Sequence, residues 1–113
     1  MDCLFCQIAA GKLPAERLYE DDDTLAFPDL HPRAPHHLLV IPKRHVESLA
    51  STNDDDWAAV AACLHTVQRV ARDRGLDTAG YRVVSNIGSD GGQTVNHLHW
   101  HVLGGRLMTW PPG

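Results

Sequence analysis

The 113-residue sequence contains few cysteines and no long hydrophobic run. Its three cysteines are an odd number in a small chain, which argues against a disulfide framework and for a reducing cytoplasm. No apolar stretch approaches the roughly 20 residues that a membrane helix needs, and no basic segment followed by an apolar one opens the chain. The sequence therefore predicts a cytoplasmic protein with neither a signal peptide nor a membrane partner.

Positive charge is also scarce. Ten lysines and arginines stand against fourteen aspartates and glutamates, for a net charge of −4. A chain of this charge is not built to bind the nucleic-acid backbone or an anionic membrane. The hydrophobic content of 43% is sufficient for a globular fold, but the length supports only one proper core. We therefore expect a single domain over residues 1–113.

What the sequence does contain is a run of alternating histidines at residues 97–103, His-Leu-His-Trp-His-Val-Leu. Successive side chains of a β-strand point to opposite faces, so His97, His99 and His101 are predicted to share one face. The apolar residues between them would then face the core. The alternative is a half-exposed strand with ordinary polar positions. Three histidines at period two favour a chemical site, because imidazole is suited to nucleophilic attack, proton transfer and metal binding.

The segment before this strand is rich in glycine. Residues 85–96 include Gly91-Gly92 and follow an expected strand at 81–84. Glycine permits backbone conformations that turn successive N–H groups toward one point, and such groups bind anions. A long hairpin loop would use the same glycines only to turn. Their position directly before the histidines favours a phosphate site.

Apolar patterns predict three further strands, over residues 16–20, 24–28 and 37–41. The first two should form a hairpin through an aspartate turn, and the second should end at Pro28, which lacks a ladder donor. The third strand is continuously apolar, which is typical of a central position.

Helical periodicity appears twice. A short helix is expected over residues 3–10, and a long helix is expected to be capped within residues 51–53, with aspartates 54–56 in its first turn, and to end at Gly75. The apolar stripe of the long helix would consist of Trp57, Val60, Ala61, Leu64, Val67 and Ala71. The sequence thus predicts an α+β fold, with about five mostly antiparallel strands and one long helix packed on the sheet.

The histidine run resembles the motif of the histidine triad (HIT) family of nucleotide hydrolases and transferases. Residues 86–105 and the terminal Trp110-Pro111-Pro112-Gly113 more narrowly resemble its Hint branch, the purine nucleoside phosphoramidases. The same likeness is seen at Leu25-Ala26-Phe27, Asp29, Ala34-Pro35 and Val40-Ile41-Pro42-Lys43. The resemblance covers nearly the whole chain. It implies one HIT domain over residues 1–113 and a two-fold homodimer whose sheets join.

The resemblance also implies roles for the histidines. His99 would be the nucleophile that attacks phosphorus, and His101 would hydrogen-bond the phosphate oxygens. His37 would help to orient and polarise the nucleophile. Thr94 stands where the Hint pattern usually has serine, and its hydroxyl would donate to the leaving nitrogen.

A nucleotide site is implied in the same way. Asp29 would bind the ribose, since a carboxylate can accept hydrogen bonds from two hydroxyls. Phe27 and Leu30 would wall the base, with core packing as the alternative for both. The resemblance implies further contacts from Asn86, Gly92 and Val95 of the same chain. It also implies a contact from Trp110 of the partner subunit.

Cys3 and Cys6 are neighbours on one helical turn, and such a pair suggests metal or redox chemistry. Zinc takes about four ligands, and spacing alone does not choose the other two. The resemblance implies that they are His45 and His97. With four protein ligands no position is left for water, so such a zinc would be structural. The alternative is a pair of small apolar side chains without a metal.

The implied function is hydrolysis of the P–N bond of purine nucleoside phosphoramidates through a nucleotidyl-histidine. One alternative is a dinucleoside polyphosphate hydrolase or nucleotidyl transferase of a sister HIT branch. Another is a non-catalytic protein that senses a nucleotide or binds a partner. An intact His99 argues against the last, because binding alone needs no nucleophile. The hydroxyl of Thr94 and the Trp-Pro-Pro-Gly ending favour the Hint branch.

Overall fold

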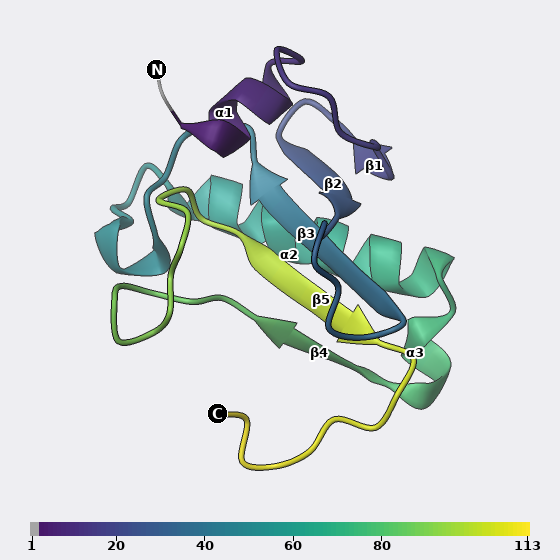
Figure 1. Cartoon of the computed structure of the whole chain (residues 1–113). Coiled ribbons are helices and arrows are strands. Elements are labelled where there is room, and N and C mark those ends of the chain that lie inside the picture. The colour runs from purple at the N-terminus through teal and green to yellow at the C-terminus, as the bar shows by residue number, and fades with distance from the viewer. Residues whose placement is uncertain (1–2) are drawn as a thin grey trace.

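The computed structural model describes residues 3–113 as an α+β fold in which a long helix covers a sheet (Figure 1). The elements are, in order, α1 (Leu4–Ala9), β1 (Tyr19–Glu20), β2 (Thr24–Pro28), β3 (His36–Pro42), the 3₁₀ helix η1 (Leu49–Ser51), α2 (Trp57–Asp73), α3 (Leu76–Ala79), β4 (Tyr81–Val84) and β5 (Trp100–Gly104). The predicted fold class is confirmed. None of the helices in residues 3–113 has the length and apolar character to cross a membrane.

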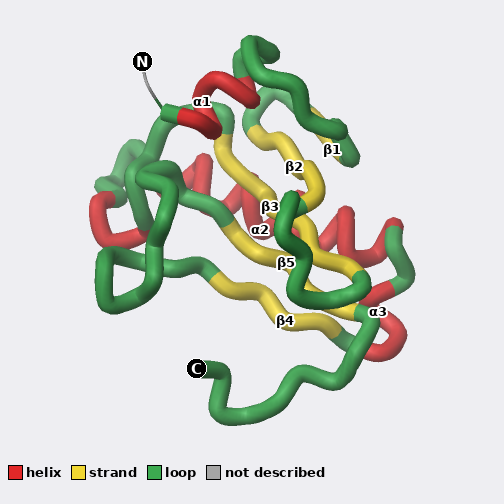
Figure 2. The backbone as a smooth tube through the Cα atoms, viewed as in Figure 1, coloured by secondary structure: helices red, strands yellow, loops and turns green. Residues whose placement is uncertain are grey.

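The five strands form one sheet in the order β1-β2-β3-β5-β4 (Figure 2). Every neighbouring pair is antiparallel. The prediction that β3 is central is confirmed, because it pairs with β2 on one side and with β5 on the other. β2 ends at Pro28 as expected. The strands that bear the site residues therefore lie side by side in the middle of the sheet.

The two faces of the central strands are covered by different helices, as the period of two requires. Ala26, Leu38 and Val40 belong to a buried cluster that includes residues of α2. Leu25, Phe27, Leu39 and Ile41 turn to the opposite face and pack against Phe5 and Ile8 of α1. The short helix α1 thus forms a second layer over one end of the sheet, on the face away from α2 (Figure 1).

The long helix begins later than predicted. Of the expected capping residues, Asn53 accepts a hydrogen bond from the Asp55 N–H at 3.0 Å, but this bond caps the preceding turn and not the helix. α2 starts at Trp57, with Asp56 at the N-cap position and residues 54–56 in a preceding turn. The Asp56 side chain does not cap the helix, because its Oδ2 accepts from the Asn53 N–H at 3.1 Å and its Oδ1 pairs with Arg44 at 3.0 Å. At the other end the prediction is correct, since Gly75 adopts a left-handed φ of 72° directly after the helix.

The buried stripe of α2 is rotated from the predicted one. It consists of Val60, Cys63, Thr66, Val67, Val70 and Ala71. Trp57 and Leu64 are 50% and 44% exposed, and Ala61 is exposed as well, so their inclusion in the stripe was wrong. The prediction was correct for Val60, Val67 and Ala71, so the two stripes overlap, and the buried side extends from these residues toward Cys63, Thr66 and Val70. Hydrophobic character alone did not decide which of two adjacent stripes meets the sheet.

Candidate functional site

The histidine run keeps its alternation although only its second half is a strand. β5 begins at Trp100, and residues 97–99 lead into it without regular structure. His97 and His99 are 0% and 5% exposed, and both rings meet Phe5 of α1 edge-on, with centroids 5.9 and 5.2 Å apart. The intervening Leu98 belongs to a buried cluster with a residue of α2. The predicted division into a histidine face and a core face is therefore confirmed.

The protonation of His99 follows from one hydrogen bond. Its Nδ1 lies 2.7 Å from the backbone carbonyl oxygen of His97. A carbonyl only accepts, so Nδ1 carries the proton and donates. In a neutral imidazole the other nitrogen, Nε2, then keeps its lone pair. His99 also lines a cavity, so the chemically available nitrogen belongs to a ring at a solvent-accessible site.

His37 and His101 form a hydrogen-bonded pair across the central strands. His37 Nε2 lies 2.9 Å from His101 Nδ1, and Asp29 Oδ2 lies 3.4 Å from the former and 3.9 Å from the latter. Burial lowers the pKa of His37, and burial together with the neighbouring histidines lowers the pKa of His101 to about 4. Both rings are therefore neutral near pH 7. His37 contacts His101 and not His99, so any influence of His37 on the expected nucleophile passes through His101.

A cavity of about 480 Å³ opens beside these histidines. It brings together a large part of the predicted site, namely Phe27, Asp29, Leu30, Thr94, Val95, His99 and His101. Phe27 is 5% exposed and packs edge-on against Phe5, so it belongs both to the core and to the cavity wall. Leu30 is 88% exposed, which excludes core packing as its role within the single chain.

Sequence reasoning missed one wall of this cavity. Leu4, Phe5 and Ile8 of α1 line it, followed by Leu13 and Pro14. The spacing of the first three residues does place them on one side of a helix. The spacing did not indicate what this side of the helix covers, because α1 meets β2 and β3 only through tertiary packing.

Three predicted nucleotide contacts lie away from the cavity. Asn86 Nδ2 donates to the Gly91 carbonyl at 2.7 Å, and the Gly92 N–H donates to the Ser89 carbonyl at 3.0 Å, so both serve the turn of their own loop. Trp110 is 81% exposed in the C-terminal segment beyond β5. Within one chain these residues do not meet the site, and their roles remain predictions.

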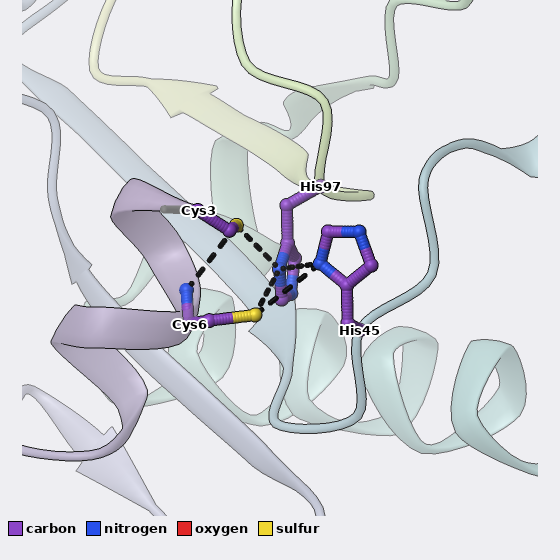
Figure 3. Close-up of side chains that lie close together, drawn as sticks. All are labelled: Cys3, Cys6, His45 and His97. Atoms are coloured by element: carbon purple, nitrogen blue, oxygen red, sulfur yellow. Dashed lines mark hydrogen bonds between the residues drawn. The ribbon is translucent and has the colours of Figure 1, made fainter. Parts of the chain in front are cut away.

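The four predicted metal ligands converge at the N-terminus of α1 (Figure 3). Their ligand atoms all lie within 4.8 Å of one another. Cys3 Sγ is 3.3 Å from His97 Nδ1, Cys6 Sγ is 3.2 Å from His45 Nδ1, and the two Nδ1 atoms are 3.2 Å apart. Tetrahedral nitrogen ligands at about 2.1 Å from zinc lie about 3.4 Å apart, and sulfur ligands slightly more. The separations therefore fit a tetrahedral zinc site.

The hydrogen bonding of His97 also suits a metal. Its Nε2 lies 2.8 Å from the Pro42 carbonyl oxygen and must donate, which leaves the Nδ1 lone pair facing the two sulfurs. Burial lowers the pKa of His97 to about 4 and raises the pKa of the Cys6 thiol to about 11. A bound cation would reverse the second effect, because thiols that coordinate a metal are deprotonated.

A second group of potential ligand atoms does not have the hydrogen bonding that a metal site requires. Asp29, His37 and His101 also lie within 4.8 Å of one another. The Arg33 N–H, however, donates to His37 Nδ1 at 3.0 Å. The proton of a neutral His37 must then sit on Nε2, which leaves no lone pair there for a metal. In the cysteine–histidine cluster, by contrast, the tautomer of His97 leaves its Nδ1 lone pair available for a metal.

Comparison with known proteins agrees with the geometry. A family model described as the HIT domain matches residues 10–108. The chain belongs to the HIT family. An uncharacterized HIT-like protein of Synechococcus elongatus is 48% identical over 112 residues, which cover 99% of this chain and 97% of that protein.

Two solved structures of HIT proteins are similar over almost their entire length. One is a HIT family hydrolase from Legionella pneumophila, with a TM-score of 0.96 and 51% identity, covering 99% of this chain and 100% of that one. The other is a histidine triad protein from Clostridium difficile, with a TM-score of 0.93 and 47% identity, covering 96% and 95%. Cys3 and Cys6 precede the residues matched by the HIT model, whereas His45 and His97 lie within them. The metal cluster would therefore tie the first helix to the matched domain.

Proposed function

We propose that this HIT protein is a hydrolase that cleaves the P–N bond of purine nucleoside phosphoramidates, as the Hint branch does, within one domain over residues 1–113. The observation that carries the proposal is His99: its Nδ1–H is held by the His97 carbonyl, and its ring lines the cavity. A neutral imidazole with a free Nε2 lone pair is a nucleophile for phosphorus. The similar Legionella protein is itself named a hydrolase.

The cavity suits a nucleoside on its apolar side. Phe27, Leu30 and the α1 residues provide apolar walls for a purine base. Asp29 stands at the same cavity with Oδ1 accepting from the His31 N–H at 2.8 Å and Oδ2 facing the histidine pair. A carboxylate so placed can accept hydrogen bonds from the ribose hydroxyls. The phosphorus would then lie beside His99.

In the first chemical step, His99 Nε2 forms a bond to phosphorus and the P–N bond to the amine breaks. His101 would donate a hydrogen bond to a phosphate oxygen, where negative charge develops. The Thr94 hydroxyl, at the edge of the cavity, would donate to the leaving nitrogen. The amine leaves as a neutral molecule after it gains a proton from solvent.

In the second step, water attacks the nucleotidyl-histidine. The water oxygen forms a bond to phosphorus and releases a proton to solvent, which replaces the proton taken up by the amine. The bond from phosphorus to His99 Nε2 breaks, the nucleotide leaves as a monophosphate and neutral His99 is restored. Two moderate barriers thus replace one high barrier. Zinc takes no part in either step. At the cysteine–histidine cluster it would fix α1, which supplies Phe5 to the cavity wall and to the ring of His99.

A comparison of two substrates separates this proposal from the sister-branch alternative. We expect kcat/KM for an adenosine phosphoramidate to exceed that for a diadenosine polyphosphate by about tenfold or more, because the Thr94 hydroxyl would donate to a nitrogen leaving group. Both rates should be measured side by side on one preparation. Faster hydrolysis of the polyphosphate would assign the protein to the sister branch. Nucleotide binding without turnover of either would favour the sensor.

We further propose that the protein is a two-fold dimer in which the C-terminus of one chain approaches the cavity of the other. β4 is an edge strand, and Val83, Leu107 and Trp110 are exposed on or near this side, at 37%, 88% and 81%. An uncovered edge strand invites pairing with another chain. Trp110 combines a large ring with a polar N–H, a combination enriched at interfaces.

Removal of the residues after Met108 tests this arrangement. We expect the truncation to change selectivity among leaving amines more than turnover of a generic substrate, because Trp110 of the partner subunit would face the amine. Nucleotide affinity should change little, since Asp29 is untouched. Kinetics on aminoacyl, alkyl and aryl phosphoramidates would measure the effect. Unchanged preferences across the series would show that the residues after Met108 do not influence substrate choice. A monomer at micromolar concentration in sedimentation would refute the proposed dimer.

A further inference from the structure

The loop between β2 and β3 is held from outside by the segment that follows β5. The Arg33 carbonyl accepts hydrogen bonds from two atoms of the Arg106 guanidinium, Nη2 at 2.9 Å and Nε at 3.3 Å. This is a forked contact to one oxygen, which restrains the orientation of the Arg33–Ala34 peptide more than a single bond would. Figure 1 shows the chain leaving β5 beside the end of this loop.

The close approach of the two segments depends on Gly105. Its φ is 92°, which side chains rarely tolerate, and a Cβ there would lie 2.8 Å from Pro35 Cβ and 3.1 Å from His36 Cδ2. The absence of a side chain lets the tail lie against the loop. Arg106 is therefore brought to Arg33 by the backbone as well as by its own hydrogen bonds.

The same residue of the loop contacts the site. The Arg33 N–H donates to His37 Nδ1 at 3.0 Å. Because a backbone N–H only donates, His37 Nδ1 must accept, and the proton of the neutral ring sits on Nε2. That proton then lies between His37 Nε2 and His101 Nδ1, which are 2.9 Å apart. His101 Nδ1 accepts it, so the proton of His101 itself is on Nε2.

The alternative arrangement would reverse the chemistry of His101. If His37 carried its proton on Nδ1, its Nε2 would accept, and His101 would have to donate through Nδ1. His101 Nε2 would then present a lone pair, which repels a phosphate oxygen, where the first arrangement presents an N–H. The hydrogen bond at the far end of the pair, together with the Asp29 carboxylate 3.4 Å from His37 Nε2, thus decides whether His101 is a donor or an acceptor toward the phosphate.

We propose that Arg106 is a positioning residue for the reaction: by holding the Arg33 carbonyl it restrains Arg33, whose N–H lies in the preceding peptide and sets the tautomer of His37 and, through it, the donor Nε2–H of His101. The catalytic consequence rests on the proposed function, whereas the tautomers do not. Arg106 itself touches neither the cavity histidines nor the nucleotide site. It is exposed, so the fold does not depend on its burial.

The test compares Arg106→Ala with Arg106→Lys and with a matched control, Arg82→Ala. Arg82 also donates to a backbone carbonyl, that of Thr109 at 2.8 Å, but not to the loop. The ring nitrogens of His37 and His101 are observed by ¹⁵N NMR in the protein as purified, since protonated and unprotonated nitrogens have distinct shifts. Kinetics on an adenosine phosphoramidate and calorimetric binding of AMP complete the comparison.

We expect the wild type and Arg82→Ala to show both Nδ1 atoms unprotonated, and Arg106→Ala to show a mixture of tautomers. In Arg106→Ala, kcat should fall about tenfold or more with AMP affinity nearly unchanged, because the lost donor acts mainly on the transition state. Arg106→Lys should retain part of the rate, since one ammonium can satisfy one carbonyl. Wild-type tautomers in Arg106→Ala would overturn the proposal, and so would an equal change of the tautomers in Arg82→Ala. Absence of wild-type turnover would refute the proposed function instead. The NMR spectra would still test whether Arg106 fixes the tautomers of His37 and His101.

Discussion

Replacement of His99 by Asn should abolish nearly all phosphoramidate turnover and leave nucleotide binding in place. The Asn amide can still donate to the His97 carbonyl that His99 Nδ1 contacts at 2.7 Å, so the local backbone keeps its partner. What is lost is the Nε2 lone pair, and with it the covalent route. Nucleophilic catalysis and its support typically supply several powers of ten, so we expect kcat to fall by about a thousandfold or more.

Steady-state rates and calorimetric binding of AMP would measure this split. His65→Asn is the matched control, because His65 is an exposed histidine of α2 that lies in no proposed site. A phosphohistidine intermediate should be trapped in the wild type and in the control but not in the His99 variant. A variant that keeps more than about a tenth of the wild-type kcat would refute the assignment, since that is a loss of only about 1.4 kcal/mol.

The second large effect should follow removal of zinc. Protein made with zinc available should contain about one ion per chain, and chelation should lower its melting temperature. If free zinc exceeds its Kd about a thousandfold, binding adds about 4 kcal/mol to the stability of the folded state. At about 4 °C per kcal/mol for a domain of this size, the melting temperature should fall by about 16 °C. Metal analysis and thermal unfolding measure the two quantities.

A pair of histidine variants gives this prediction a control. His45→Ala removes an exposed ligand, and His65→Ala removes an exposed histidine outside the cluster, so both cost little packing. Only the first should lower the zinc content and the melting temperature. Protein without zinc, although zinc was supplied, would rule out the site. Loss of activity with an unchanged melting temperature after chelation would instead indicate a catalytic metal.

Local patterns predicted much of this protein because they depend on neighbouring residues alone. The alternation at residues 97–103 placed His97 and His99 opposite Leu98 although no regular strand forms there, since any extended backbone has a period of two. The turn after β1 and the glycine stop after α2 follow from local backbone chemistry in the same way.

Patterns that require a partner surface were less informative. The predicted start of α2 was wrong because residues 54–56 form a separate turn, closed by hydrogen bonds of Asn53 with Asp55 and Asp56, and the helix begins only after it. Its stripe was rotated because both candidate stripes carry apolar residues and only contact with the sheet chooses between them. The cavity wall from α1 was missed for a similar reason, since a short apolar helix face does not indicate what it covers.

The sequence by itself determined the histidine face, the α+β class and, through its motifs, the HIT family that the comparisons confirm. The tertiary structure decided which nitrogens are free. Three contacts do this: the His97 carbonyl on His99, the Pro42 carbonyl on His97 and the Arg33 N–H on His37. Each joins a ring to a backbone group whose position depends on the fold, and the contact between Pro42 and His97 links segments far apart in the chain. A residue type states that an imidazole is present, but its partners decide whether a given nitrogen attacks, donates or binds a metal.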